Sequence, residues 1–484
     1  MSPYDLILRG GTLVTADGLQ EADLAVADGR IADISPELEG AAREVVDASG
    51  LHVFPGAIDA HAHFNEPGRT HWEGFATGTR ALAAGGITAY VEMPLNAHPP
   101  TCDAQSFDLK LAAAEASSLV DFGLWGGLVP GNVERLDELA ERGVMGFKAF
   151  MSNSGIDDFQ AAEDLTLYEG MQRAAELGLP VLVHAENDQI TSLLARRAVA
   201  SGRTTMRDYL ASRPVVAELE AIGRAILLAE ETVCSLHVVH VSTGRGIALV
   251  AAARARGVDV TCETCAHYLI LTGEDAEELG AVAKCAPPLR SQEHLEGLWG
   301  QIFENNVQFV TSDHSPAPPD MKVGDDFVKI WGGIMGCQSL LNVMLDEGYH
   351  ERGLPLEQVA ALTSGTVADR FGFSGKGRLE VGSDADFTLV DLDSSFTLRA
   401  EDLFYRHKMS PYVGRIFRGK VVRTTLRGTT VFREGKVVSE PVGQVMKPSR
   451  RAAATLGVSA EQAGQPPRTS GTGGADVQQI GEAN

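Results

Sequence analysis

The two ends of the chain share a pattern in which short runs of apolar residues alternate with turns. The runs lie at residues 5–8, 12–14, 22–26 and 30–34 near the start, and at 385–391, 421–428 and 430–438 near the end. Two of the intervening turns read Gly-Gly and Asp-Gly, which are typical of β-hairpins. We therefore expect a small β-sandwich domain formed from both chain ends, residues 1–53 and 376–443.

Between these ends, apolar runs alternate with segments of helical periodicity. The eight apolar runs cover residues 53–63, 87–94, 122–129, 144–151, 180–186, 236–242, 258–264 and 307–313. Segments such as 133–142 and 246–255 instead carry apolar residues three or four positions apart, as on one face of a helix. Nearly continuous apolar strands are typical of a parallel sheet covered on both faces. The pattern predicts an α/β fold with a (β/α)8 TIM-like barrel over residues 54–375.

The end of the chain has a different composition. Residues 444–484 are rich in Pro, Gly, Ser, Ala and Gln. Such a segment cannot bury enough apolar surface to fold. We expect residues 444–484 to be a disordered tail without catalytic residues.

The charge balance and the hydropathy of the chain limit the kinds of molecule that it is expected to bind. The chain has 41 Lys and Arg against 65 Asp and Glu, a formal net charge of -24. Nucleic acids and anionic membranes bind clustered positive charge, so this balance argues against both and favours a small-molecule substrate. No run reaches the roughly 18 apolar residues of a membrane helix, and the first residues do not read as a secretion signal. We expect a cytoplasmic protein.

The six cysteines are scattered along the chain, which suits reduced, mostly buried thiols better than a disulfide framework. Cys262 and Cys265 form the one Cys-x-x-Cys pair. A zinc or redox role for that pair is open, but its strand-like neighbours favour a structural role.

Six side chains that could bind metal ions lie toward the ends of predicted strands. They are His61, His63, Lys148, His184, His240 and Asp313. In a strand, residues two positions apart point to the same face, so the first two histidines can reach one point. The carboxyl ends of barrel strands open onto one face, so we expect all six to converge. Each could alone be a hydrogen-bonded core residue or a cap, but together they predict a metal site.

Lys148 is a cation among these candidate ligands. It lies between Phe147 and Phe150 on a predicted interior strand, where an ammonium group is costly to bury and where metal cations would repel it. Either this lysine is deprotonated, or it has been converted to an anionic group.

The order of these six residues on successive strands resembles that of the binuclear cyclic amidohydrolases, which include dihydroorotases, hydantoinases, dihydropyrimidinases and allantoinases. The resemblance covers residues from about 3 to 443. It implies that Lys148 takes up carbon dioxide and becomes a carboxylysine, whose carbamate bridges two divalent metal ions. It also implies that His61, His63 and Asp313 hold the first ion, and His184 and His240 the second. Zinc is the expected metal, manganese, cobalt and iron being alternatives, and the implied assembly is a homotetramer.

Within this family, further stretches are similar to the allantoinases. They are residues 65–74, 92–96, 184–187, 262–268, 284–290 and 331–334. Asn65 stands where dihydroorotases usually have Arg, and residues 151–155 lack the Tyr typical of hydantoinases and dihydropyrimidinases. The resemblance thus implies hydrolysis of (S)-allantoin to allantoate in purine catabolism. The alternatives are hydrolysis of other five- or six-membered cyclic ureides and, more remotely, a non-enzymatic dihydropyrimidinase-like scaffold, which the complete ligand set disfavours.

On this interpretation Asp313 acts as general base and then as general acid, because it can accept a proton from the attacking water and deliver it to the leaving nitrogen. The expected substrate contacts are Asn96 and the backbone of Cys285, Ala286, Gly332 and Gly333. Ala286 stands where relatives often have Ser, a harmless change if the backbone makes the contact. His267 and His314 lie outside the ligand pattern, and we expect them to have supporting roles.

Overall fold

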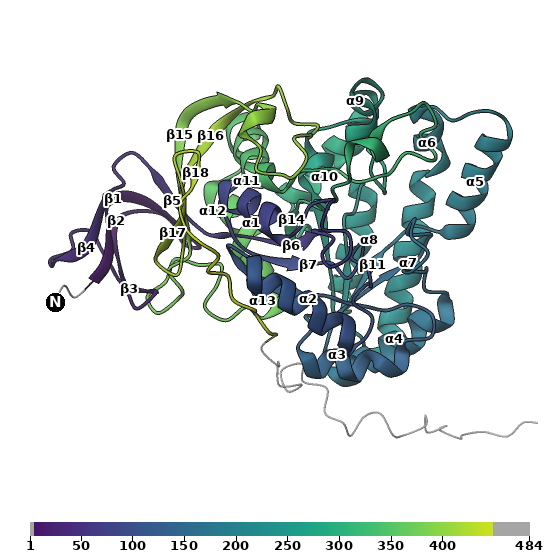
Figure 1. Ribbon diagram of the computed structural model, residues 1–484, viewed down its shortest axis with the longest axis horizontal. Coiled ribbons are helices and arrows are strands. Elements are labelled where there is room, and N and C mark those ends of the chain that lie inside the picture. Colours follow the sequence, from purple (N-terminus) through teal and green to yellow (C-terminus); the bar gives the residue numbers. More distant parts are fainter. Residues whose placement is uncertain (1–3, 449–484) are drawn as a thin grey trace, which may run out of the picture. The chain divides into compact units, whose positions relative to one another are not determined.

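Both ends of the chain enter one sheet of nine strands in the computed structural model, which describes residues 4–448. Its strands are β1 (Tyr4–Thr15), β2 (Gly18–Ala27), β3 (Arg30–Ser35), β4 (Ala42–Asp47), β5 (His52–Pro55), β15 (Phe387–Thr397), β16 (Ile416–Leu426), β17 (Thr429–Arg433) and β18 (Lys436–Val437). Their order is β18-β17-β16-β15-β5-β1-β2-β3, with β4 paired to β1. The antiparallel pair of β5 and β15 joins the two ends, so purple and yellow-green strands lie side by side in Figure 1. The limits proposed for a separate β-sandwich domain stay a prediction.

Two parallel sheets occupy the middle of the chain. The three-stranded sheet contains β6 (Ala57–Ala62), β7 (Ile87–Glu92) and β8 (Asp121–Leu124), and the six-stranded sheet contains β9 (Gly126–Gly127), β10 (Phe147–Phe150), β11 (Val181–His184), β12 (Leu236–Val238), β13 (Val260–Cys265) and β14 (Phe309–Thr311). Every neighbouring pair of strands is parallel. Nearly all of their residues are buried, as the continuous apolar runs predict for a sheet covered on both faces.

The two parallel sheets meet at two seams. At the first, the chain passes from β8 to β9, and the backbone N–H of Trp125 donates to the carbonyl of Glu92 at 3.0 Å. At the second, Ala62 of β6 forms an isolated parallel bridge with His314, just beyond β14. Within the described residues, continuous strand pairing stops at these seams. The structure therefore shows a mixed α/β fold, and a closed barrel stays a prediction.

Helices alternate with the parallel strands. They are α1 (Phe75–Ala84), α2 (Ala104–Ser117), α3 (Leu136–Arg142), α4 (Asp164–Leu177), α5 (Asp188–Ala200), α6 (Met206–Ser212), α7 (Val215–Thr232), α8 (Gly244–Ala255), α9 (Gly273–Leu279), α10 (Gln292–Phe303), α11 (Leu340–Val343), α12 (Leu356–Ala360) and α13 (Thr366–Phe371). Several begin at a capping side chain: Asp103 accepts from the backbone N–H of Ser106, and Thr243 accepts from that of Gly246. Such caps satisfy N–H groups that the first turn leaves unpaired.

Shorter helical segments lie in the connections. They are η1 (Val133–Arg135), η2 (Ala266–Leu269), η3 (Gly280–Ala283), η4 (Pro319–Lys322), η5 (Cys337–Ser339) and η8 (Ala400–Asp402), which are 3-10 helices, and η6 (Met344–Glu351) and η7 (Ala361–Gly365), which are π-helices. One of them, η3, ends directly before Lys284, which lines the cavity described below.

The first predicted run, residues 53–63, is divided at Gly56 between two sheets. Residues before Gly56 belong to β5 in the nine-stranded sheet, and residues after it belong to β6. A Cβ atom on Gly56 would lie 2.1 Å from Oγ1 of Thr88 in β7. Glycine therefore allows the backbone to pass close to β7 where it leaves one sheet for the other.

Two strands end earlier than their apolar runs predict. β12 stops at Val238 and β14 at Thr311, two residues before His240 and Asp313. The φ angles of His240 and Asp313 are 42° and 43°. Positive φ is uncommon in residues other than glycine and is concentrated at functional sites. Both side chains thus project from residues that follow the strands rather than from the strands themselves.

The expected disordered tail begins with residues that the structure describes. The backbone N–H of Gln444 donates to Oδ1 of Asp121 at 2.8 Å, and Val445 forms a parallel bridge with Phe122 of β8. The rest of the expected tail, from 449 onward, lies outside the described residues. Among the described helices, none combines the length and the apolar character that crossing a membrane requires.

Candidate metal centre

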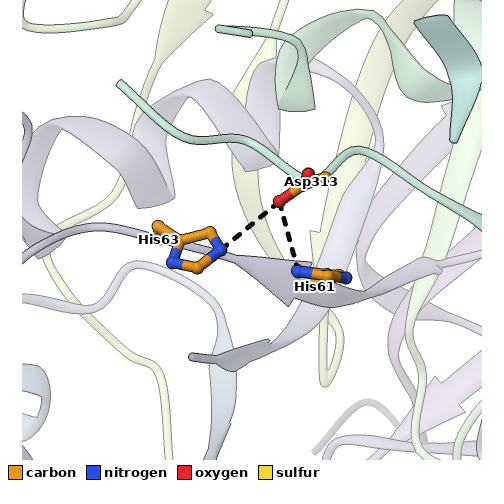
Figure 2. Close-up of side chains that lie close together, drawn as sticks. All are labelled: His61, His63 and Asp313. Carbon is orange, nitrogen blue, oxygen red and sulfur yellow. Dashed lines mark ion pairs between the residues drawn. The ribbon is translucent and has the colours of Figure 1, made fainter. Parts of the chain in front are cut away.

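Three of the six predicted ligands meet at one point. Nε2 of His61 lies 3.2 Å from Oδ1 of Asp313, and Nε2 of His63 lies 3.3 Å from the same oxygen. Figure 2 shows both rings pointing toward this carboxylate. His61 lies on β6, His63 directly follows β6, and Asp313 lies in the loop after β14. Although burial raises the pKa of Asp313, His61 and His63 lower it below its usual range, so the carboxyl group is ionised.

The other two predicted histidines face each other beside this group. Nδ1 of His184, at the end of β11, lies 3.0 Å from Nε2 of His240. The ring centres of His61 and His240 are 5.4 Å apart, so the two groups are contiguous. Burial lowers the pKa of His184 and of His240, which keeps both imidazoles neutral. Two neutral imidazole nitrogens this close can share one proton or bind a common cation.

Lys148 is fully buried on β10, and its Nζ makes no hydrogen bond within the described residues. Nζ lies 5.0 Å from the centre of the Phe150 ring. Burial lowers the pKa of Lys148 to about 7, although Asp313 and Glu263 act in the opposite direction. The amine is therefore partly neutral near pH 7, and the neutral amine is the form that reacts with carbon dioxide, so this pKa is compatible with both explanations drawn from the sequence.

Residues 52–431 match the model of the Amidohydrolase family. The chain belongs to this family. The resemblance inferred from the sequence is thereby confirmed, and membership implies a metal-dependent hydrolase with a binuclear metal centre.

Three relatives of this amidohydrolase carry the same name, allantoinase. An allantoinase of Rubrobacter xylanophilus is 70% identical over 450 residues, which are 93% of this chain and 99% of that protein. An allantoinase of Desulfitobacterium hafniense strain Y51 is 54% identical, over 93% of this chain and 100% of that protein. One of Escherichia coli O1:K1 is 48% identical, over 89% of this chain and 95% of that protein.

Solved structures similar to this amidohydrolase carry other names. The L-hydantoinase (dihydropyrimidinase) from Arthrobacter aurescens has a TM-score of 0.90 and 38% identity, over 92% of this chain and 100% of that one. The dihydropyrimidinase from Brevibacillus agri NCHU1002 has a TM-score of 0.87 and 32% identity, over 93% of this chain and 100% of that one. The fold is thus shared along almost the whole length of these hydantoinase-type enzymes.

The side chains present in this amidohydrolase fit the metal centre that its family implies. Nδ1 of His240 and Nζ of Lys148 are buried and have no hydrogen-bond partner within residues 4–448. Buried polar atoms without partners are costly, and unpaired nitrogens of this kind are suitable metal ligands. Four imidazoles, one carboxylate and a lysine that can become anionic form a donor set suited to two divalent cations.

Glu263 supports the first histidine of the centre, and the sequence analysis missed it. Its Oε1 lies 2.5 Å from Nδ1 of His61, and its Oε2 lies 3.1 Å from Nε2 of His237. Burial raises the pKa of Glu263, but these two histidines lower it to about 2. An ionised carboxylate on Nδ1 leaves Nε2 of His61 free to face Asp313, an arrangement common around metal-binding histidines.

Glu186 supports His184 in a comparable way. Its Oε2 lies 2.9 Å from Nε2 of His184, and it also accepts hydrogen bonds from Arg213. Although burial raises the pKa of Glu186, Arg213 and His184 lower it to about 2. With Nε2 held by the carboxylate, Nδ1 of His184 is the nitrogen that faces His240.

Asp59 fixes the segment that carries Asp313. Its Oδ2 accepts from the hydroxyl of Ser312 at 2.5 Å, and its Oδ1 accepts from the backbone N–H of Ser312 at 3.2 Å. These bonds tie β6 to the residue before Asp313. The signal available for Asp59, Glu186 and Glu263 was an acidic residue within an apolar run or just after it.

A cavity of about 360 Å³ opens beside the centre. Five of the six predicted ligands line it, and the sixth, Lys148, is fully buried. The five predicted substrate contacts, Asn96, Cys285, Ala286, Gly332 and Gly333, also line this cavity. The carbonyl of Asn96 accepts from Arg69 at 2.6 Å, which fixes the backbone from which its amide side chain projects.

The remaining residues noted in the sequence are His314, His267, Cys262 and Cys265, of which His267 interacts electrostatically with Asp313 and His61 of the centre. Nδ1 of His314 accepts from the backbone N–H of Gly336 at 3.2 Å. His267 is buried, and burial lowers its pKa to about 4. Sγ of Cys262 contacts the Gln308 side chain and Sγ of Cys265 contacts Thr311, so the two thiols have different surroundings.

Proposed function

We propose that this amidohydrolase hydrolyses (S)-allantoin to allantoate by opening its cyclic amide, a step of purine catabolism. The names of relatives that are 48% to 70% identical support this substrate. The observation that carries the proposal is one cavity lined both by five candidate metal ligands and by the five candidate substrate contacts. A ring amide bound there would lie beside the groups that attack it.

We propose that His61, His63 and Asp313 hold one metal ion, that His184 and His240 hold the other, and that the carbamate of Lys148 binds both. When bound, the two cations would acidify the attacking water and polarise the carbonyl. Zinc is the expected metal, and manganese, cobalt or iron would suit the same mixed nitrogen and oxygen ligands. The lowered pKa of Lys148 supports carbamate formation, because the neutral amine is the form that attacks carbon dioxide.

Asp313 is the proposed proton carrier. It is ionised at neutral pH because His61 and His63 lower its pKa, so it can accept a proton from the attacking water. It then delivers this proton to the ring nitrogen, which leaves as a neutral amine rather than as an anion. Asn96 and the backbone at 285–286 and 332–333 would meanwhile hold the ring by hydrogen bonds.

The second candidate function is hydrolysis of other cyclic ureides. The names of the hydantoinase and dihydropyrimidinase neighbours favour it. The deciding experiment compares kcat/KM on allantoin, hydantoin, dihydrouracil and dihydroorotate with one preparation of the metal-loaded enzyme. We expect the highest value on allantoin. A higher value on hydantoin or dihydrouracil would favour the second candidate, and inactivity on all four would exclude both.

We also propose an architecture and an oligomeric state for this amidohydrolase. The eight parallel strand positions, with β8 and β9 counted as one, support a (β/α)8 barrel whose strand ends carry the metal ligands. We expect a cytoplasmic homotetramer that binds neither nucleic acid nor membranes. Light scattering of the purified protein tests the tetramer.

A further inference from the structure

Two buried lysines that have no part in the proposed chemistry lie near the substrate side of the cavity. Lys284 precedes Cys285, and Lys322 ends η4; their residues are 5% and 7% exposed. In the described part of the chain, the lysines that pair with carboxylates are Lys110, Lys329 and Lys376. Neither Lys284 nor Lys322 forms a salt bridge there, and Asp326 acts on Lys284 only from a longer distance. Burial lowers the pKa of Lys284 to about 8 and that of Lys322 to about 7, which reflects the cost of an unpaired ammonium group.

Both ammonium groups donate to backbone carbonyls of the segment 330–333, which lines the cavity. Nζ of Lys284 donates to the carbonyl of Ile330. Nζ of Lys322 donates to the carbonyl of Gly333 at 2.6 Å and to that of Ala281 at 3.3 Å. In their protonated form both amines donate more strongly than neutral donors do. The two lysines thus hold this segment at both ends.

Other contacts hold the same segment against residues 284–286. The backbone N–H of Gly333 donates to the carbonyl of Lys284 at 2.7 Å. The hydroxyl of Tyr209 donates to the carbonyl of Cys285 at 2.8 Å, and Nζ of Lys284 lies 4.4 Å from the centre of the Tyr209 ring. Gly333 has a φ of 120°, and a Cβ there would lie 2.2 Å from the carbonyl oxygen of Ser315. Glycine is therefore required at this contact.

Some backbone groups along the cavity form hydrogen bonds within the protein, and others remain available to a ligand. Both backbone groups of Gly333 and the carbonyl of Cys285 are hydrogen-bonded. The backbone groups of Ala286 and Gly332, which also line the cavity, have no such partner within residues 4–448. A cyclic ureide has alternating N–H donors and C=O acceptors around its ring. It can therefore bridge fixed backbone groups on two facing segments.

We propose that Lys284 and Lys322 are positioning residues for substrate specificity, which hold the backbone of Ala286 and Gly332 at the separation that a cyclic ureide spans. The substrate class in this inference rests on the proposed function. Neither lysine belongs to the metal ligands. Loss of either one therefore weakens substrate binding and leaves the metal content and the chemical step nearly unchanged.

The test uses Lys284→Met and Lys322→Met in the metal-loaded enzyme. Methionine has a similar length but no donor and no charge. KM for allantoin should rise about 10- to 100-fold, as expected for the loss of a charged hydrogen bond, while kcat changes by less than about threefold. KM does not depend on the fraction of protein that folds, so partial misfolding does not obscure the result. The metal content per folded chain should equal that of the wild type.

The control is Lys436→Met, at an exposed position on β18, which should keep both kinetic constants. Lys284→Gln and Lys322→Gln retain neutral donors, so their KM should rise less than in the methionine variants. A wild-type KM in both methionine variants would overturn the proposal, and so would equal rises for glutamine and methionine. If the wild-type enzyme leaves allantoin intact, the proposed function fails. The same variants are then compared on whichever of hydantoin and dihydrouracil it hydrolyses.

Discussion

Nδ1 of His61 lies 2.5 Å from Oε1 of Glu263, and both side chains are 1% exposed. This contact joins β6 to β13 and sets the orientation of the His61 ring, so that Nε2 points toward Asp313. A carboxylate on one nitrogen of a histidine also makes the other nitrogen a stronger donor to a metal ion. The strength of metal binding should therefore depend on a residue that is not itself a ligand.

Glu263→Gln should lower the affinity for the metal about 10- to 100-fold, because the neutral amide cannot replace the carboxylate on His61. Competition with a chelator of known affinity measures the change. Asp23→Asn removes another buried carboxylate, in β2 of the nine-stranded sheet, and serves as the control. Equal affinities for the Glu263 variant and the wild type would exclude a supporting role for this contact.

Lys148→Ala should remove bound metal and reduce activity by about three orders of magnitude or more, as expected when one member of a catalytic unit is lost. Metal analysis and a hydrolysis assay check this. If the missing group is an anionic carbamate, added propionate should restore part of the activity, because a carboxylate supplies the same kind of oxygen ligand. A variant with wild-type metal content and turnover would rule out the carbamate bridge.

Asp313→Asn should reduce kcat about 100- to 10,000-fold, the usual contribution of a general acid or base. Substrate binding depends on other residues, so KM should change by less than about threefold. Metal content is measured in parallel, because Asp313 is also a proposed ligand. Unchanged turnover in a fully metal-loaded variant would exclude the proton-transfer role.

The pH dependence of stability should reflect Glu186. Its pKa is about 2 in the folded protein and 4.5 for the unperturbed group, so the folded state binds the proton more weakly than the unfolded chain does. The stability that the lowered pKa of Glu186 contributes to the folded protein is present above about pH 4.5 and is lost as the pH falls toward 2. The difference in unfolding free energy between the metal-free wild type and Glu186→Gln should therefore shrink from about pH 5 to pH 3. A difference that stays constant over this range would contradict the assignment.

The sequence predicted the parts of the fold that depend on periodic burial. Each of the eight apolar runs contains a parallel strand, because a strand buried on both faces must be apolar along its whole length. The ligand positions could be predicted for a related reason. His61 and His184 interrupt apolar strands close to their carboxyl ends, and Lys148 interrupts the apolar strand β10; such an interruption is costly unless the side chain has a function.

Other features of the site depend on tertiary contacts and could not be predicted in the same way. The positive φ of His240 has no local signal, since histidine does not favour that conformation strongly enough to end a strand. Glu263 is 202 positions from His61, and only the fold brings the two together. Glu186 is two positions from His184, but the sequence does not show which nitrogen of His184 it holds. The sequence around Lys284 does not show whether this lysine is buried or exposed, because its hydrogen-bond partner, Ile330, is 46 positions away.

The pairing of β5 with β15 has a consequence for synthesis of the protein on the ribosome. β5 ends at Pro55 and its neighbour begins at Phe387, so roughly 330 residues must be added before this edge of β5 is covered. At usual translation rates this takes on the order of a minute. During that time the nascent chain exposes an unpaired strand edge, which is a site for aggregation or for a chaperone. The metal-binding half of the molecule must therefore emerge and begin to fold while the sheet that joins the two chain ends is still incomplete.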